Sequence, residues 1–186
     1  PIPGTEQHMA CDTLLLSVGL IPENELSLGA GVQLSGITGG PLVDNSLQTN
    51  VPGIFACGNV LHVHDLVDHV SAESAVAGRA AAAYIHGRSW QGTTVPVHDG
   101  AGVRGSVPQR LLLPDGPADF EVRLMFRPTE VFHNQYVLVK ADDRLLLSRK
   151  GRIYTPGEMA NVVLTPAVLE ECRGAQQVTV EISPTK

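Results

Sequence analysis

The sequence predicts an α/β part of the form ββα with buried strands, followed by a small antiparallel β-sandwich of Ig-like proportions. Two short apolar runs, residues 14–18 and 54–57, each end at a glycine and predict the buried strands. An alanine-rich stretch over residues 72–86 predicts a helix. Beyond residue 108, polar and apolar residues alternate with a period of two, which is typical of half-buried antiparallel strands.

Residues 92–108 separate these two patterns. They contain Gly, Pro, Thr and His without any periodicity, which predicts a linker with its surrounding loops. We therefore expect two domains, residues 1–98 and residues 99–186.

Composition narrows the class of protein. With 186 residues and 43% hydrophobic content, the chain has the composition of a globular protein, and its apolar runs fall short of a membrane span. The net charge is −6 and the 13 Lys and Arg residues are scattered, which argues against a nucleic-acid partner. No signal-peptide pattern is visible, so we expect a cytoplasmic protein.

The first predicted strand, residues 14–18, ends at Gly19 and leads into a loop that contains Pro22. The second, residues 54–57, follows a turn and ends at Gly58 and Asn59. Because Gly58 has no Cβ, a ligand can approach its backbone closely, and nucleotides bind beyond strand ends in open α/β sheets. Asn59 offers an acceptor and donors to a hydroxyl-rich ligand. This combination indicates a flavin-contact element.

In these two stretches the chain resembles the FAD-dependent pyridine nucleotide-disulphide oxidoreductase superfamily. Residues 49–59 look like its second FAD-contact motif, T-x-x-x-G-I-F-A-x-G-D, with Asn59 where the family has Asp. Residues 11–24 look like the C-D-x-x-x-x-x-x-G-x-x-P-N stretch that returns the chain from the NADH domain to the FAD domain. The resemblance implies part of a Rossmann-like FAD-binding domain, with FAD and NAD(P)H as cofactors. It also implies an oxidoreductase that passes hydride from nicotinamide to flavin and on to an unknown acceptor.

The sequence lacks the G-x-G-x-x-G turn that holds the FAD pyrophosphate in this family. We therefore expect the chain to be the C-terminal part of a longer enzyme, with the missing N-terminal half of the same polypeptide as its first partner. On its own it is expected to be inactive and to carry no stoichiometric FAD.

The predicted helix over residues 72–86 places Val70, Ala77, Ala81 and Ile85 along one face. Asp68 or Ser71 can cap its start, and Gly87 follows its end, as is common for helices. The resemblance implies that the start of this helix points at the pyrimidine oxygen of the flavin. The residues nearest that oxygen are then Val67, Asp68 and His69.

A metal site is an alternative for the histidines in this region. His62, His64 and His69, with Asp65 and Asp68, are of the types that bind zinc or iron. The motif already has a flavin explanation, however, and the set lacks a second liganding segment. We therefore assign no metal ligand and no catalytic residue. His69 remains either a donor to the flavin or a simple surface or capping residue.

The three cysteines, Cys11, Cys57 and Cys172, lie far apart and form no C-x-x-C pair. Cys57 is expected to be a small buried hydrophobe rather than a redox group.

The β-rich tail carries six predicted strands, over residues 110–113, 121–127, 135–140, 144–150, 160–164 and 177–182. It resembles the β-rich end of a branch of FAD-dependent oxidoreductases found beside a glycerol-3-phosphate dehydrogenase-like flavoprotein. That resemblance implies such a flavoprotein subunit, or a second copy in a homodimer, as a partner. The alternative function is an interaction module whose β-sandwich docks a partner subunit or dimer mate.

Overall fold

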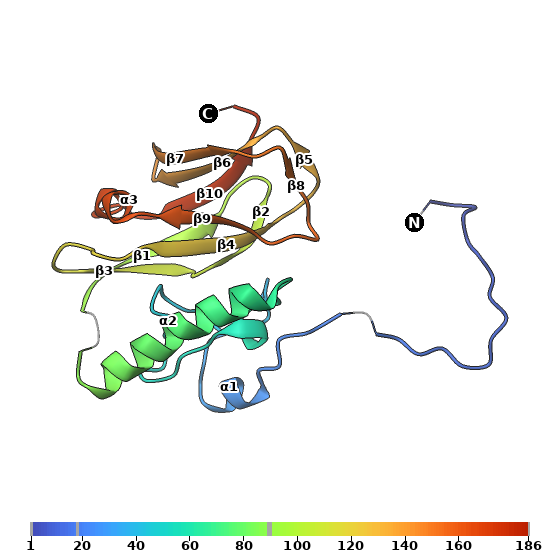
Figure 1. Ribbon diagram of the computed structural model, residues 1–186, viewed down its shortest axis with the longest axis horizontal. Helices are drawn as coiled ribbons and strands as arrows, with labels where there is room; N and C mark the ends of the chain where they lie inside the picture. Colours follow the sequence, from blue (N-terminus) through green and yellow to red (C-terminus); the bar gives the residue numbers. More distant parts are fainter. Residues whose placement is uncertain (1, 18, 89–90, 186) are drawn as a thin grey trace.

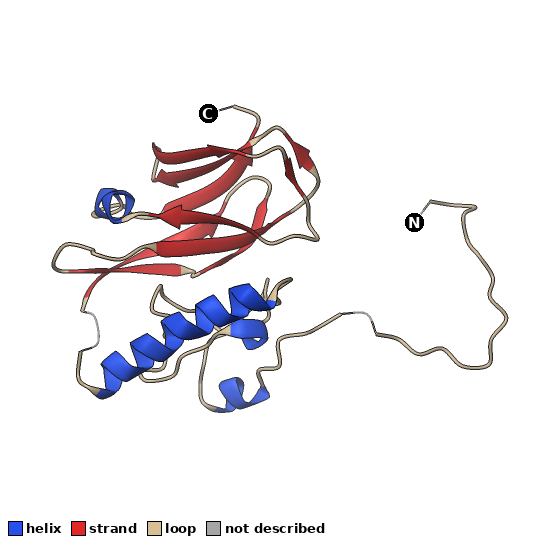
Figure 2. Ribbon diagram, viewed as in Figure 1, coloured by secondary structure: helices blue, strands red, loops and turns tan. Residues whose placement is uncertain are grey.

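The computed structural model describes residues 2–17, 19–88 and 91–185. The strands gather in one part of the molecule, and α2 lies against that part with the loops that precede it (Figures 1 and 2). The helices are α1 (Glu25–Gly29), the 3-10 helix η1 (Gly58–Val60), α2 (Val67–Ile85) and α3 (Pro166–Glu171). None of the helices in the described ranges is both long enough and apolar enough to cross a membrane.

The β-rich part contains a five-stranded sheet in the order β3-β1-β10-β6-β7, a three-stranded sheet in the order β2-β4-β9, and the β5-β8 pair. These strands are β1 (Gly92–Asp99), β2 (Val103–Val107), β3 (Arg110–Pro114), β4 (Val122–Pro128), β5 (Phe132–His133), β6 (Tyr136–Ala141), β7 (Arg144–Lys150), β8 (Ile153–Tyr154), β9 (Ala160–Leu164) and β10 (Val178–Ser183).

One hydrophobic cluster lies between these sheets. In β10, Val178, Val180 and Ile182 are buried while the residues between them are partly exposed, as the period-two pattern predicts. The same cluster takes in buried side chains of β1, β3, β4, β6 and β9. The six strands predicted in the tail are therefore confirmed, with ends that shift by one residue. The pairs are antiparallel except for β1 with β10, which is parallel, and the Ig-like arrangement stays a prediction.

The predicted linker over residues 92–108 is wrong, because this stretch forms β1 and β2. Val95 and Val97 of β1 alternate with exposed residues and enter the core. At Gly92, an added Cβ would lie 1.9 Å from the carbonyl oxygen of Leu113 in the paired strand, so the glycine permits the close pairing. β1 runs across the domain boundary that the sequence placed at residue 98.

The predicted strand over residues 14–18 does not form in the part of it that the structure describes. Leu14, Leu15 and Leu16 are 73%, 90% and 75% exposed, and they lie in an extended N-terminal segment that runs away from the rest of the molecule (Figure 1). Val18 lies outside the described residues. A buried strand needs hydrogen-bonded neighbours on its edges, and residues 2–17 have none among the described strands.

The predicted strand over residues 54–57 is also wrong as a strand. Only Phe55 makes an isolated bridge, to Gln48. The segment is nevertheless packed, because Ala56 is buried in a second, smaller cluster with Val43, Leu47, Leu61, Ala77 and Val107. Ala56 is thus buried as predicted, but α2, loops and the end of β2 surround it instead of a parallel sheet.

The predicted helix is confirmed as α2, which begins five residues earlier than expected, at Val67. Its N-cap residue is Leu66, so neither Asp68 nor Ser71 caps the start. Gly87 follows the end with φ 67° and donates its N–H to the carbonyl of Tyr84, which is the predicted C-terminal arrangement. The buried residues of α2 are Ala77 and Glu73.

Candidate flavin-contact loop and histidine–glutamate cluster

Gly58 begins the loop that connects the packed segment to α2. Its φ of 70° belongs to the left-handed region, which glycine adopts at little cost. A Cβ at this position would lie 3.3 Å from Cγ1 of Val70, so the first turn of α2 packs closely against the loop. The N–H of Gly58 donates a hydrogen bond of 2.5 Å to Oε2 of Glu73. The loop is therefore fastened to α2 through its first residue.

Glu73 is a buried carboxylate that receives hydrogen bonds from two histidines as well. Nε2 of His62 lies 2.7 Å from Oε1, and Nε2 of His64 lies 3.0 Å from Oε2. Burial raises the pKa of Glu73, but the bonds from His62, His64 and the Gly58 N–H outweigh it and lower the pKa to about 2. The carboxylate is therefore ionised at neutral pH, and three donors surround it.

The imidazole rings of this cluster lie close together. His62 and His64 meet edge to face, with ring centroids 4.3 Å apart, and His69 is 6.4 Å from His64 by the same measure. Nδ1 of His64 and Nδ1 of His69 are buried and have no hydrogen-bond partner within the described residues. The loop thus places two unpaired ring nitrogens next to the buried carboxylate.

The other predicted contact residues lie at the surface. Asn59 is exposed, and its Oδ1 accepts a hydrogen bond of 3.1 Å from the N–H of His64. Val67 is 74% exposed and Asp68 is also exposed, both in the first turn of α2. The structure therefore places Asn59, Val67 and Asp68 where solvent or a ligand reaches them, whereas Gly58 and the histidines are turned inward.

Glu73 was missed in the sequence. Its signal is an acidic residue three positions after Val70 and four before Ala77, on the face of α2 that packs inward. A charged residue on a buried face requires partners, and His62-x-His64 is the nearest polar pair along the chain. Glu73 also supplies the second liganding segment whose absence led us to set a metal aside.

Asp65 links the same loop to the β-rich part. Its Oδ1 accepts a hydrogen bond of 2.6 Å from Arg127 of β4, and its Oδ2 accepts one of 2.6 Å from the N–H of Met159. Arg127 also donates to the carbonyl of Val63 at 3.0 Å. Partial burial raises the pKa of Asp65, but the bonds from Arg127 and Met159 outweigh it and hold the pKa below its usual value.

Replacing Arg127 by Met is expected to lower the free energy of unfolding by about 1–2 kcal/mol, because the charged hydrogen bonds to Asp65 and Val63 are lost. Since the folded-state pKa of Asp65 is lowered, this contribution is present above the usual aspartate pKa and is lost as the pH falls below it. Urea unfolding at neutral and at acidic pH measures this. A difference between Arg127→Met and wild type that does not shrink in acid would contradict the assignment. Arg123→Met, at an exposed arginine of the same strand, is the control.

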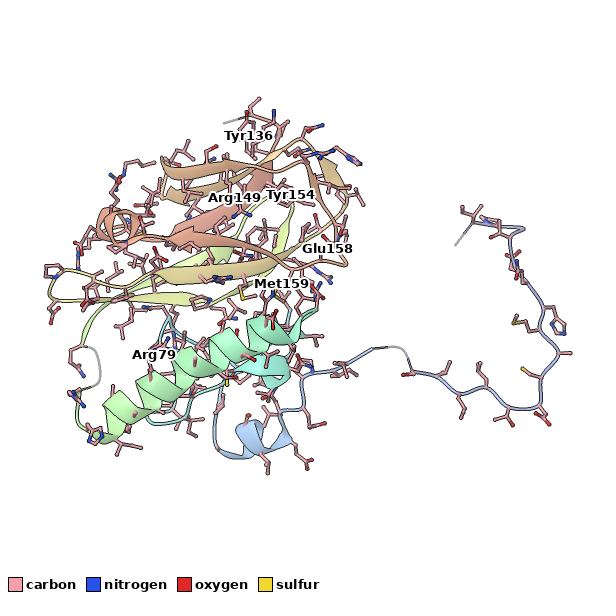
Figure 3. The ribbon with its side chains drawn as sticks, in the orientation of Figure 1. Arg79, Tyr136, Arg149, Tyr154, Glu158 and Met159 are labelled. Carbon is pink, nitrogen blue, oxygen red and sulfur yellow. The ribbon has the colours of Figure 1, made fainter. Side chains whose placement is uncertain are left out.

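A cavity of about 360 Å³ lies between α2 and the β-rich part. His69, Glu73 and Arg79 line it from α2, and Val107 and Met125 line it from β2 and β4. Figure 3 shows Arg79 on α2, facing the strands of the β-rich part. The cavity therefore borders the histidine–glutamate cluster at His69 and Glu73 and is lined by charged as well as apolar side chains.

The cysteines are free: Cys11 is exposed, Cys57 is half-buried and Cys172 is buried. Burial raises the pKa of Cys172 to about 11, so its thiol stays protonated at neutral pH.

A comparison with protein families matched the N-terminal part of the chain. Residues 2–82 match the family model described as pyridine nucleotide-disulphide oxidoreductase. This segment contains both resembling motifs and most of α2, and the match confirms over these residues the resemblance found in the sequence. Comparisons with curated proteins and with solved structures gave no match.

Proposed function

We propose that this chain is the C-terminal part of an NAD(P)H-dependent FAD flavoprotein oxidoreductase. The family match over residues 2–82 carries the proposal. In it, residues 1–98 complete a Rossmann-like FAD-binding domain whose N-terminal half supplies the phosphate-binding turn. The exposed leucines at 14–16 are then the side chains that a neighbouring strand and helix of that half would cover. Three free cysteines fit a reducing compartment such as the cytoplasm.

The residues present fit the ribityl and ring end of FAD. Asn59 is exposed and can hydrogen-bond a ribityl hydroxyl, although its Oδ1 is also used by His64. The first turn of α2, with the exposed Val67 and Asp68 and the half-buried His69, offers a helix N-terminus, which stabilises negative charge. Gly58 keeps its N–H on Glu73, so its role is to let the loop turn closely past α2. When FAD is bound, its flavin ring would accept a hydride from NAD(P)H and pass the electrons to an acceptor.

The alternative function is an interaction module. The β-rich part has a hydrophobic core of its own and lies outside the family match, so it can serve as a separate docking unit. Its partner is then a second copy of the chain or a glycerol-3-phosphate dehydrogenase-like flavoprotein subunit, with the Ig-like sandwich as the docking surface. Capture of such a subunit by residues 91–186 alone would favour this alternative.

The test of the flavoprotein proposal is to produce the chain joined to the polypeptide encoded upstream of residue 1. That protein should purify yellow with about one FAD per chain, and NADH or NADPH should bleach the flavin absorbance without oxygen. The 186-residue chain alone should remain colourless, because it has no G-x-G-x-x-G turn. A colourless longer protein, or a yellow short one, would contradict the proposal.

Asn59→Leu in the yellow protein tests the ribityl contact separately. It should weaken FAD binding by about 1–3 kcal/mol, because a buried hydroxyl is left without its partner. Asn161→Leu, at a half-buried asparagine of β9, is the matched control. An unchanged FAD dissociation constant for Asn59→Leu would reject this contact while leaving the class of enzyme intact.

A further inference from the structure

The cluster around Glu73 is a second candidate site beside the flavin contacts, and it shares His69 with them. His62 and His64 come from the loop after η1, and Glu73 comes from α2. His69 lies four residues before Glu73 on the same helix, so both project from one face. The donors therefore come as two pairs, H-x-H and H-x-x-x-E, from two different elements. Two pairs of this kind from separate segments are a common way of enclosing a metal ion.

The distances within the cluster suit a small cation. One ligand atom each from His62, His64 and Glu73 lies within 4.8 Å of the others, and all three residues are buried. Tetrahedral donors that bind zinc at about 2.0–2.2 Å lie roughly 3.4 Å from one another. The separations between the histidine Nε2 atoms and Glu73, 2.7 and 3.0 Å, are somewhat shorter than this value. Small side-chain shifts would therefore convert hydrogen bonds into ligation.

Contacts outside the donor set favour a metal as well. The N–H of Gly58 donates to Oε2 of Glu73, and hydrogen bonds of this kind orient the carboxylate ligands of metal ions. Nδ1 of His69 is buried, lacks a partner within the described residues and lies on the side of His64. Among the same residues, Nδ1 of His64 lacks a partner as well. The three ligand atoms that already lie within 4.8 Å of one another belong to His62, His64 and Glu73, so His69 becomes the fourth ligand through a rotation of its side chain.

The charge of the cluster is compatible with a divalent ion. Glu73 brings a buried carboxylate to the cluster, and a bound cation would compensate its negative charge. Two imidazoles with one carboxylate are a ligand set used by zinc and by ferrous iron. With His69 added, four protein ligands close the site, which is the arrangement of structural rather than catalytic zinc.

We propose that His62, His64, His69 and Glu73 bind a divalent first-row transition metal ion, with Zn²⁺ as the ion of best fit. The ion joins the loop after Gly58 to α2 and so fixes the first turn of that helix. This role goes beyond the flavoprotein function and does not depend on it, because all four ligands lie within the chain itself.

The experiment uses the 186-residue chain, stripped with EDTA and dialysed, without any flavin. Titration with Zn²⁺ should saturate at one ion per chain and raise the melting temperature. Co²⁺ in place of Zn²⁺ should give visible absorption of the intensity expected from four-coordinate nitrogen and oxygen ligands. The readout is thus metal content, stability and a spectrum, none of which requires the missing half of the flavin site.

Two variants and one control make the test specific. His69→Asn leaves the Glu73 hydrogen bonds in place, and His64→Gln retains a donor toward Glu73, so both should fold. Each should weaken Zn²⁺ binding by at least about tenfold, since even residues that only orient ligands contribute 10–100-fold. His133→Asn, at an exposed histidine of β5, should bind as the wild type does. Absence of saturable Zn²⁺ binding to the native chain, or unchanged affinity in His64→Gln or His69→Asn, would overturn the proposal.

Discussion

A fragment of residues 91–186 is expected to melt cooperatively as a monomer, whereas a fragment that begins at Gly105 is not. The difference is β1, which lies between β3 and β10 and pairs with both, together with Val103 and Arg104 at the start of β2, which pair with β4. Without β1, β3 loses its hydrogen-bonded neighbour and the core loses Val95 and Val97. Far-UV circular dichroism melts and sedimentation of the two fragments measure this directly.

Residues 1–88 provide the complementary fragment. Within residues 2–17 and 19–88 the strand pairing amounts to isolated bridges, and Val43 and Leu61 share their cluster with Val107 of β2. This half should therefore show no cooperative melt and should associate through its exposed leucines. A cooperative, monomeric melt of residues 1–88, or of a fragment starting at Gly105, would show that the two parts divide elsewhere.

Replacing Glu73 by Ala in the metal-free chain is expected to lower the free energy of unfolding by about 3–5 kcal/mol. The substitution leaves buried donors without an acceptor, namely the Gly58 N–H and the two histidine rings, and it leaves a cavity. Urea unfolding measures the change. Glu130→Ala, at an exposed glutamate, is the control and should stay within about 0.5 kcal/mol of the wild type.

The effect of Glu73→Ala should also depend on pH. The pKa of Glu73 falls from 4.5 to about 2 in the folded chain, so its contribution is fully present above pH 4.5. It is lost as the pH falls from there toward 2, because the carboxylate becomes protonated. The difference in stability between the wild type and the variant should shrink across this interval. A constant difference would mean that packing, and not the ionised carboxylate, is what the substitution removes.

The strands of the tail could be predicted from the sequence because each is marked by the pattern of its own residues. In β10 each buried residue is followed by a more exposed one, and that alternation is visible in the sequence. β1 was not predicted because Gly92 and Pro96 are typical of loops. A glycine is needed at position 92 because the backbone of Leu113, 21 positions away in the chain, lies too close for a Cβ. Local pattern carries no information about such a neighbour.

The N-terminal half shows the opposite error. The run predicted as a strand, residues 14–18, has the composition of a buried strand, but a strand also needs a sheet, and composition does not supply one. The residues of the candidate site also fall into a part that the sequence predicts and a part that it does not. Gly58, Asn59 and the start of α2 could be found by motif, whereas the partners of Glu73 lie 9 to 15 residues earlier and meet it only through the turn at Gly58.

The bonds of Asp65 have a consequence for motion. Asp65 is held from β4 by Arg127 and from the segment before β9 by Met159, and the next residue, Leu66, is the N-cap of α2. A rotation of the β-rich part therefore carries the start of α2 with it unless both bonds break. On timescales shorter than that breakage the helix and the sheets turn as one body, and the exposed segment before residue 18 is left to move independently.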